Sequence, residues 1–181
     1  VIQKYMDAGS EGVLIPLVNT REDAKRVVDA VKYPPMGKRG LAGYRASNYG
    51  LVGSLGDYVR MANEETLIAV QVETLEAVKN LKDILAVDGV DVVFFGPTDL
   101  SSVLGMPGQT RHPEVVALIE RLGKETIAAG RVAGTLARDL DEYRLWRSKG
   151  FLFLCTGVAG LLARGTQEFL KEVRDYDKAR H

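Results

Sequence analysis

Short runs of consecutive apolar residues alternate along the chain with stretches in which apolar residues recur every three or four positions. The runs are rich in β-branched and aromatic residues, which is typical of parallel strands buried on both faces. We therefore expect strands at 12–18, 67–72, 90–95, 131–136 and 151–155. The intervening stretches have the helical period, and we expect helices at 21–31, 55–65, 75–85, 114–129, 140–149 and from 159 to the end. Strands that alternate with helices predict βαβ units and an α/β fold.

The number of units leaves two architectures open. About five βα units fit in the chain, and an open α/β sheet could be built from five strands, whereas a (β/α)₈ barrel needs eight strands and typically about 250 residues. A length of 181 residues predicts a single domain, 1–181. The chain enters an apolar helical pattern directly at Val1, so we expect the C-terminal part of a longer fold. In both architectures, functional groups are expected where the strands end.

Two carboxylates follow neighbouring predicted strands. Glu73 comes directly after the strand at 67–72, and Asp99 comes shortly after the strand at 90–95. Neighbouring parallel strands lie about 4.8 Å apart, so both carboxylates could reach one ion if these strands pair. Two carboxylates that leave other positions to water and substrate suit Mg²⁺ or Mn²⁺. The alternative is that each residue only caps the helix that follows.

Three further features at or near strand ends each have two interpretations. Gln71 shares a face of its strand with Glu73 and could hold a water or a ligand, or be a satisfied core amide. The segment 96–98 (Gly-Pro-Thr) could present free backbone N–H groups to a carboxylate, or be a plain turn. The glycine-rich loop 37–43 carries positive charge, and it could grip a substrate anion or be simply solvated.

Composition narrows the class of protein. Lys and Arg total 24, as do Asp and Glu, which argues against nucleic-acid or anionic-membrane partners. No apolar run reaches about 18 residues, so no membrane span is expected. A single cysteine, Cys155, excludes an internal disulfide and fits a reducing cytoplasm. No lysine lies at a predicted strand end, so a Schiff base is not supported. The histidines, His112 and His181, lie in a loop and at the terminus, which gives a Ser–His–Asp triad little support.

Four segments, in this order, carry a resemblance to a known family. They are 6–18 (MDAGSEGVLIPLV), 32–40 (KYPPMGKRG), 71–74 (QVET) and 95–101 (FGPTDLS). Together they resemble the HpcH/HpaI aldolase family, the metal-dependent pyruvate aldolases, which include 4-hydroxy-2-oxoheptanedioate aldolase and 2-dehydro-3-deoxyglucarate aldolase. The resemblance implies a (β/α)₈ TIM barrel of the phosphoenolpyruvate/pyruvate type. It also implies a divalent metal, Mg²⁺ or Mn²⁺ with Co²⁺ as an option, a 2-oxo acid substrate that yields pyruvate, and a homo-oligomer, a trimer or a hexamer, whose subunits exchange helices.

The resemblance implies roles for single residues as well. Glu73 and Asp99 would bind the metal, with Gln71 in the same site. Leu136 would pack beside the aldehyde. Asp7 would enter the site of a neighbouring subunit and assist the base there, and its alternative is a surface acid near a helix end. The backbone amides of one turn would hold the pyruvate carboxylate: Gly96, Pro97, Thr98 and Asp99.

The implied activity is metal-dependent retro-aldol cleavage of 4-hydroxy-2-oxo acids to pyruvate and an aldehyde. One alternative is an acyl-CoA lyase of the citrate lyase β type, although the segment 32–35 (KYPP) fits the aldolase branch better. Another is an inactive truncated subunit, because no residue here matches the family's catalytic His or its pyruvate-polarising Arg. Many relatives also carry an acid where this chain has Ala159.

Overall fold

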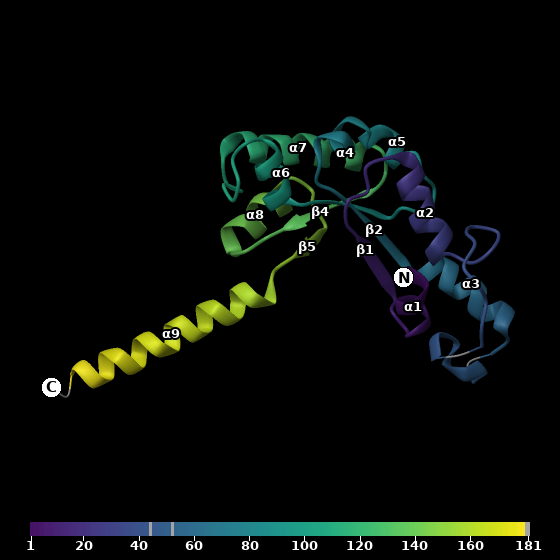
Figure 1. Cartoon of the computed structure of the whole chain (residues 1–181), viewed down its shortest axis with the longest axis horizontal. Helices are drawn as coiled ribbons and strands as arrows, with labels where there is room; N and C mark the ends of the chain where they lie inside the picture. Colours follow the sequence, from purple (N-terminus) through teal and green to yellow (C-terminus); the bar gives the residue numbers. More distant parts are fainter. Residues whose placement is uncertain (44, 52, 180–181) are drawn as a thin grey trace.

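Within the part of the chain that the structure describes, five strands form one parallel sheet, and helices such as α2, α4, α5 and α7 cover one side of it (Figure 1). The structure is a computed structural model that describes residues 1–43, 45–51 and 53–179. The elements in chain order are α1 (Ile2–Asp7), β1 (Gly12–Ile15), α2 (Arg21–Val31), η1 (Arg45–Gly50), α3 (Leu55–Glu65), β2 (Leu67–Val72), α4 (Leu75–Lys79), α5 (Leu81–Leu85), β3 (Val92–Phe95), α6 (Pro97–Val103), α7 (Pro113–Ala128), β4 (Val132–Leu136), α8 (Leu140–Ser148), β5 (Phe153–Cys155) and α9 (Val158–Lys178).

The strand order distinguishes the two predicted architectures. In space the strands follow the chain order, β1-β2-β3-β4-β5, with every pair parallel. A doubly wound sheet reverses direction at a switch point, and this sheet does not. Right-handed connections that always step the same way place the helices on one face, as in a barrel. The sheet is therefore part of a (β/α)₈-type barrel, and the open doubly wound alternative is excluded.

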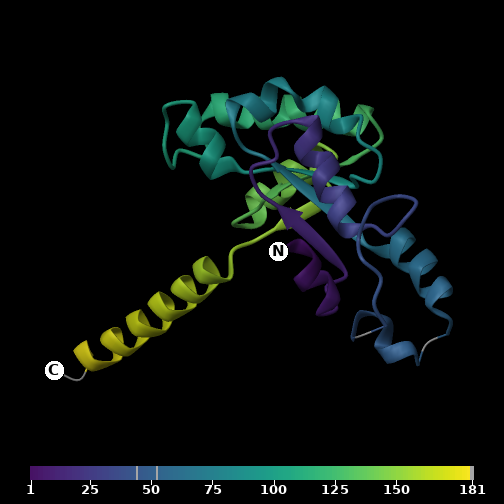
Figure 2. The ribbon, with the colours of Figure 1, turned by 45° about the vertical axis from the view of Figure 1, so that its right-hand side comes forward.

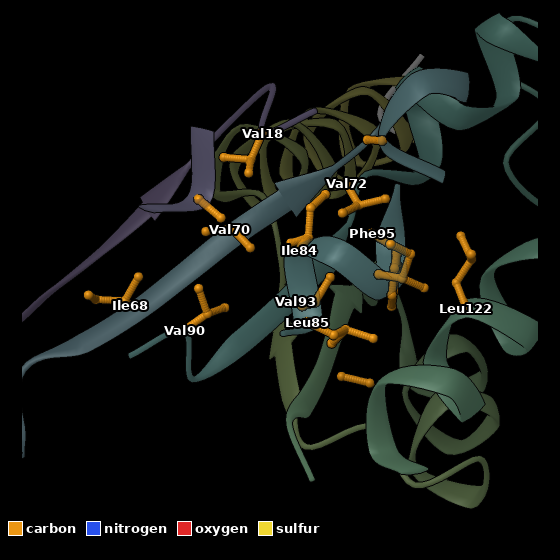
Figure 3. Close-up of a cluster of buried hydrophobic side chains, with 14 of the residues drawn as sticks. Val18, Ile68, Val70, Val72, Ile84, Leu85, Val90, Val93, Phe95 and Leu122 are labelled. Atoms are coloured by element: carbon orange, nitrogen blue, oxygen red, sulfur yellow. The ribbon is translucent and has the colours of Figure 1, made fainter. Parts of the chain in front are cut away.

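The two faces of the sheet differ in what they bury. The helix-facing side holds the main core, in which Val70 on β2 and Val93 on β3 are in register and fully buried. Figure 3 shows this cluster, with Val72, Phe95 and Leu122 among its members. The opposite face carries another row, in register across four strands: Gln71, Phe94, Gly134 and Phe153. This second face corresponds to the interior of a barrel. The side chains at the C-terminal ends of its strands form the candidate site.

Local signals explain where the helices begin. Thr20 accepts a hydrogen bond from the N–H of Asp23, whose side chain accepts from Thr20 in return, so α2 starts with a capping box. The predicted apolar stripe of α2 is buried against the sheet. The predicted helix at 75–85 is two helices, α4 and α5, which meet at Asn80. Asn80 leaves the helical conformation there and donates its side-chain N–H to the Asn19 carbonyl at 2.9 Å.

Several strands are shorter than predicted. β1 ends at Ile15 rather than at residue 18, because Pro16 has no N–H and Leu17 adopts a left-handed φ of 56°. β3, β4 and β5 begin one or two residues later than expected. Two short helices were not predicted: η1 lies between the predicted helices at 21–31 and 55–65, and α6 follows β3 directly.

Helix α9 projects from the body of the molecule as a separate arm (Figures 1 and 2). None of its described residues is buried. Among the described residues, no helix combines the length and the apolar composition that a bilayer-spanning segment needs. That 1–181 forms a single domain stays a prediction.

Candidate functional site

The candidate site lies where β2 and β3 end. Val72 and Phe95 are in register, so the residues that follow them, Glu73 and Gly96, leave the sheet side by side. Gln71 lies two residues before Glu73 and therefore points to the same, barrel-interior face. The structure thus brings together three of the polar segments that the sequence singled out.

Folding buries the Glu73 carboxylate and fixes it from both sides. The side chain is only 4% exposed. Its Oε1 accepts the backbone N–H of Leu17 at 3.0 Å, and its Oε2 accepts the side-chain amide of Gln71. The cap of α4 is Thr74, whose hydroxyl accepts from the N–H of Ala77 at 3.0 Å. Glu73 is therefore not the cap of α4. The side-chain amide of Gln71 is hydrogen-bonded to Glu73 itself.

Asp99 faces Glu73 from the first turn of α6. Asp99 is exposed to solvent, and its carboxyl is near enough to act on the charge of Glu73. Burial, and after it the negative charge of Asp99, raise the pKa of Glu73 above its usual range, although the N–H of Leu17 and the amide of Gln71 act in the opposite direction. Two neighbouring carboxylates, one of them buried, form a site at which a cation would relieve the repulsion.

Gly96 leaves room for this arrangement. A Cβ at this position would lie 2.8 Å from Oε2 of Glu73 and 3.0 Å from Nε2 of Gln71. Gly96 is also the N-cap of α6, with Pro97 at the first helical position. The segment 96–98 is therefore the start of a helix and not a plain turn. The N–H groups of Thr98 and Asp99 belong to this first turn and have no acceptor within the helix.

Leu136, which the sequence analysis placed beside the aldehyde, lies on the same side of the sheet as Gln71. Leu136 pairs with Cys155 and lies two residues beyond Gly134, which places it on the barrel-interior face of β4 at the same rim. Cys155 is only partly buried.

Asp7 does not approach Glu73 within one chain. It ends the helix that leads into the start of β1, whereas Glu73 lies past the end of β2. Asp7 accepts a hydrogen bond at 2.8 Å from Arg39, whose guanidinium is buried over the ring of Tyr33. Arg39 of the glycine-rich loop is therefore an internal structural residue in this chain rather than part of the strand-end site.

Sequence reasoning missed the backbone amide of Leu17, because a side-chain pattern carries no signal for it. Among the described residues, no group of three or more His, Cys, Asp or Glu side chains could hold a metal ion. His112 caps α7 through Nδ1, which accepts from the N–H of Glu114 at 3.3 Å. The chemistry of the described site therefore rests on Glu73, Asp99 and their neighbours.

Comparisons with known proteins agree with this architecture. A crystal structure of an HpcH/HpaI aldolase from Desulfitobacterium hafniense DCB-2 superposes with a TM-score of 0.89 at 34% identity, over 96% of this chain and 67% of that one. The chain is 42% identical over 164 residues to a hydroxypyruvate/pyruvate aldolase of Cupriavidus necator, covering 90% of this chain and 60% of the relative. It is 41% identical over 169 residues to a 4-hydroxy-2-oxo-heptane-1,7-dioate aldolase of Klebsiella pneumoniae, covering 92% and 63% respectively.

The chain thus spans about three fifths of the length of these two curated relatives. A family model described as HpcH/HpaI aldolase/citrate lyase matches residues 1–165. This match covers most of the chain, and the parallel sheet and the strand order accord with it. The chain belongs to the HpcH/HpaI aldolase/citrate lyase family.

Proposed function

We propose that the protein is a carbon–carbon lyase that cleaves 4-hydroxy-2-oxo acids to pyruvate and an aldehyde with the help of a divalent metal. The observation that carries this proposal is that Glu73 and Asp99 follow the ends of two adjacent, in-register barrel strands, where the charge of Asp99 acts on the buried Glu73 carboxyl. Functional groups of barrel enzymes are found at this end of the strands.

The residues present fit a divalent cation. Glu73 and Asp99 supply two hard oxygen ligands, and the absence of a Cβ at Gly96 keeps the space beside Glu73 open. One or two carboxylates with the remaining positions left to water and substrate is the arrangement that Mg²⁺ and Mn²⁺ accept, and Co²⁺ is a further option. When bound, such an ion supplies the Lewis acidity that stabilises negative charge on the keto oxygen during C–C cleavage.

The chain's own residues would bind and orient the substrate. The first-turn N–H groups of Thr98 and Asp99, set up by Gly96 and Pro97, would hold the pyruvate carboxylate, since free amides at this position favour an anion. Gln71 keeps Glu73 in place through the bond to its Oε2. Leu136, on the same face, would form an apolar wall beside the aldehyde.

The names of the two relatives guide the choice of substrate class. Both are named as aldolases, one for hydroxypyruvate and pyruvate and the other for a 4-hydroxy-2-oxo acid. Cleavage of malyl-CoA or citramalyl-CoA, but not of a 4-hydroxy-2-oxo acid, would instead favour the acyl-CoA lyase alternative. The single partly buried cysteine is in keeping with a reducing compartment, and we propose the cytoplasm.

We also propose that several chains assemble, as a trimer or a hexamer. The support is α9, which leaves large apolar side chains exposed along one side of an amphipathic helix. In such an assembly Asp7, whose side chain is 36% exposed, would reach a neighbouring subunit's site. Within one chain its described partner is Arg39.

The proposal is tested by deuterium exchange into the methyl group of pyruvate, followed by NMR. The purified protein is incubated with pyruvate in D₂O with Mn²⁺ or Mg²⁺, and then with EDTA. We expect exchange that depends on the metal. Glu73→Gln and Asp99→Asn should each reduce it by about a hundredfold or more, since even outer-shell partners of a metal are worth about 10–100-fold.

The matched control is Glu76→Gln, which removes an exposed carboxylate from α4 only three residues away. This variant should exchange deuterium at the wild-type rate. Retention of exchange by both site variants would refute the carboxylate pair. Metal binding without exchange or cleavage of any 4-hydroxy-2-oxo acid would refute the lyase.

A further inference from the structure

The hydrogen-bond ladder between β1 and β2 contains an irregularity next to the site. Leu67 donates its N–H to the Glu11 carbonyl, and Gly12 is in register with Leu67. In a regular parallel ladder that continues from this pairing, the Gln71 carbonyl would accept the N–H of Leu17. It accepts the N–H of Val18 instead, at 3.2 Å. One extra residue is therefore inserted directly after β1, where the chain still pairs with β2, and this irregularity is a β-bulge.

The bulge frees one backbone N–H and directs it to the site. The N–H of Leu17, displaced from the ladder, donates to Oε1 of Glu73 at 3.0 Å. Bulges are over-represented beside active sites, where they redirect groups that a regular strand would keep in the sheet. The carboxylate that receives this bond is almost completely buried, so bulk water cannot readily replace the donor.

The bulge holds Leu17 in an unfavourable backbone conformation. Its φ of 56° lies in the left-handed region, which leucine rarely adopts. The side chain is 61% exposed, so burial of the leucine in this chain does not account for the conformation. Local strain of this kind persists where surrounding structure requires it, and it concentrates at functional sites.

We propose that Leu17 is a positioning residue for the metal-binding carboxylate. Its strained backbone places an N–H on Oε1 of Glu73, while Gln71 binds Oε2, so the carboxylate is oriented toward Asp99 before any ligand arrives. The role belongs to the left-handed backbone and not to the apolar side chain. This inference rests on the proposed metal site.

The test exploits two substitutions with opposite effects on the backbone. Leu17→Val keeps an apolar side chain, but a β-branched residue is strongly disfavoured at positive φ. Leu17→Asn removes the apolar side chain, but asparagine tolerates the left-handed region. If the bulge matters, Leu17→Val should weaken Mn²⁺ binding more than Leu17→Asn does. If only apolar packing matters, the order should be reversed.

The readout is the Kd for Mn²⁺, measured by electron paramagnetic resonance of free Mn²⁺ in the absence of substrate. We expect Leu17→Val to raise the Kd by about tenfold or more, the effect typical of groups that support a metal ligand, and Leu17→Asn to remain within about threefold of wild type. A Val variant that binds as tightly as wild type, or an Asn variant that binds as weakly as the Val variant, would overturn the proposal. Wild-type protein whose Mn²⁺ binding is absent or insensitive to Glu73→Gln would overturn the metal site itself and the positioning role with it.

A second measurement covers the case in which the Val variant does not fold. In wild-type protein labelled with ¹⁵N-leucine, the Leu17 amide proton should resonate downfield, because its acceptor is charged. Glu73→Gln should shift it upfield more than any other leucine amide. An unchanged Leu17 resonance in that variant would show that the bond is not made.

Discussion

Glu73 is the residue at which folding and the proposed chemistry oppose each other. Its carboxylate is buried next to a second carboxylate, and both the burial and the like charge raise its pKa. A bound cation would favour the ionised carboxylate of Glu73. In the metal-free protein the same ionised carboxylate lowers the stability of the fold. Such a conflict between stability and activity is common at functional sites.

Glu73→Gln should therefore stabilise the metal-free protein at neutral pH. The folded-state pKa of Glu73 is raised above its unfolded value of 4.5, so its stabilising contribution is complete below pH 4.5 and is lost as the pH rises through the folded pKa. We expect the variant to melt about 2–4 °C above wild type at pH 7–8, the shift that about 1 kcal/mol gives in a domain of this size. The difference should disappear toward pH 4. Thermal unfolding in EDTA across this range measures it.

Glu142→Gln provides a control of opposite sign. Burial raises the pKa of Glu142, but ion pairs with Arg138 and Arg111 outweigh it, so the net shift is downward. The stabilisation from Glu142 is therefore present above its unfolded pKa and is lost as the pH falls. Glu142→Gln should lower the Tm at neutral pH. A fall in Tm for both variants at pH 7–8 would contradict the interpretation of Glu73.

The site residues differ in how far the sequence could predict them. Glu73 and Asp99 could be predicted, because both the ends of strands and the carboxylate residues can be recognised in a sequence. The amide of Leu17 was not, because any residue except proline supplies an N–H. Leucine is also a poor indicator of positive φ, so only the three-dimensional ladder reveals the bulge.

At the scale of elements, the start of α6 shapes the site. The glycine that caps this helix lies against Glu73 and Gln71, and its φ of −78° is one that alanine adopts freely. Backbone strain therefore plays no part, and the requirement for glycine is purely steric. A methyl group here would enter the space occupied by Oε2 of Glu73.

Gly96→Ala should weaken Mn²⁺ binding by about 10–100-fold, because the new Cβ displaces the carboxylate and its amide partner. The matched control is Gly157→Ala. Gly157 also caps a helix after a strand, with a φ of −85°, but nothing lies within 4 Å of its Cβ position. Both variants lose the same N-cap preference, and only Gly96→Ala should affect the metal Kd. Equal effects of the two would show that capping, not the steric contact, matters.

A glycine in α7 gives a second steric prediction, now for stability. A Cβ at Gly123 would lie 2.2 Å from the ring of Phe151, which is fully buried against Trp146. Alanine is favoured over glycine in a helix by about 1 kcal/mol, but overpacking a core costs about 1–3 kcal/mol. Given so close a contact, we expect Gly123→Ala to destabilise the protein by about 1–2 kcal/mol in urea unfolding.

Phe151→Leu should partly rescue this variant, because the smaller side chain vacates the space that the new methyl group needs. The two substitutions together should cost less than the sum of the two alone. Strict additivity would argue that the methyl group and the ring do not meet.

The elements were predictable where the pattern was long and undisturbed. The strand at 67–72 and the helix at 21–31 match the structure, because a nearly unbroken apolar run marks the first and a regular apolar spacing marks the second. α6 was missed because its seven residues, with proline at the first position, are too few to show a helical period. β1 was overextended because its apolar run continues through the bulge.

At the scale of the whole molecule, α9 is the feature that the body of the chain does not explain. The helix extends away from the sheet in both views (Figures 1 and 2). Its exposed apolar residues recur at helical spacing and share one side: Val158, Leu161, Leu162, Phe169, Leu170 and Val173. A helix with a continuous apolar stripe normally buries that stripe, so α9 is expected to pack against another chain.

Phe169→Glu should therefore reduce the molecular mass of the protein in solution. Phe169 is 64% exposed in the single chain and lies within the apolar stripe, so a charge there would have to be buried in the proposed assembly. Lys171→Glu is the matched control, since it adds the same side chain to the same helix on the opposite, polar side. Light scattering coupled to size-exclusion chromatography at micromolar concentration should give an oligomer for wild type and Lys171→Glu, and a smaller species for Phe169→Glu. If wild type itself has the mass of one chain, or if both variants keep the wild-type mass, the stripe of α9 does not hold the assembly together.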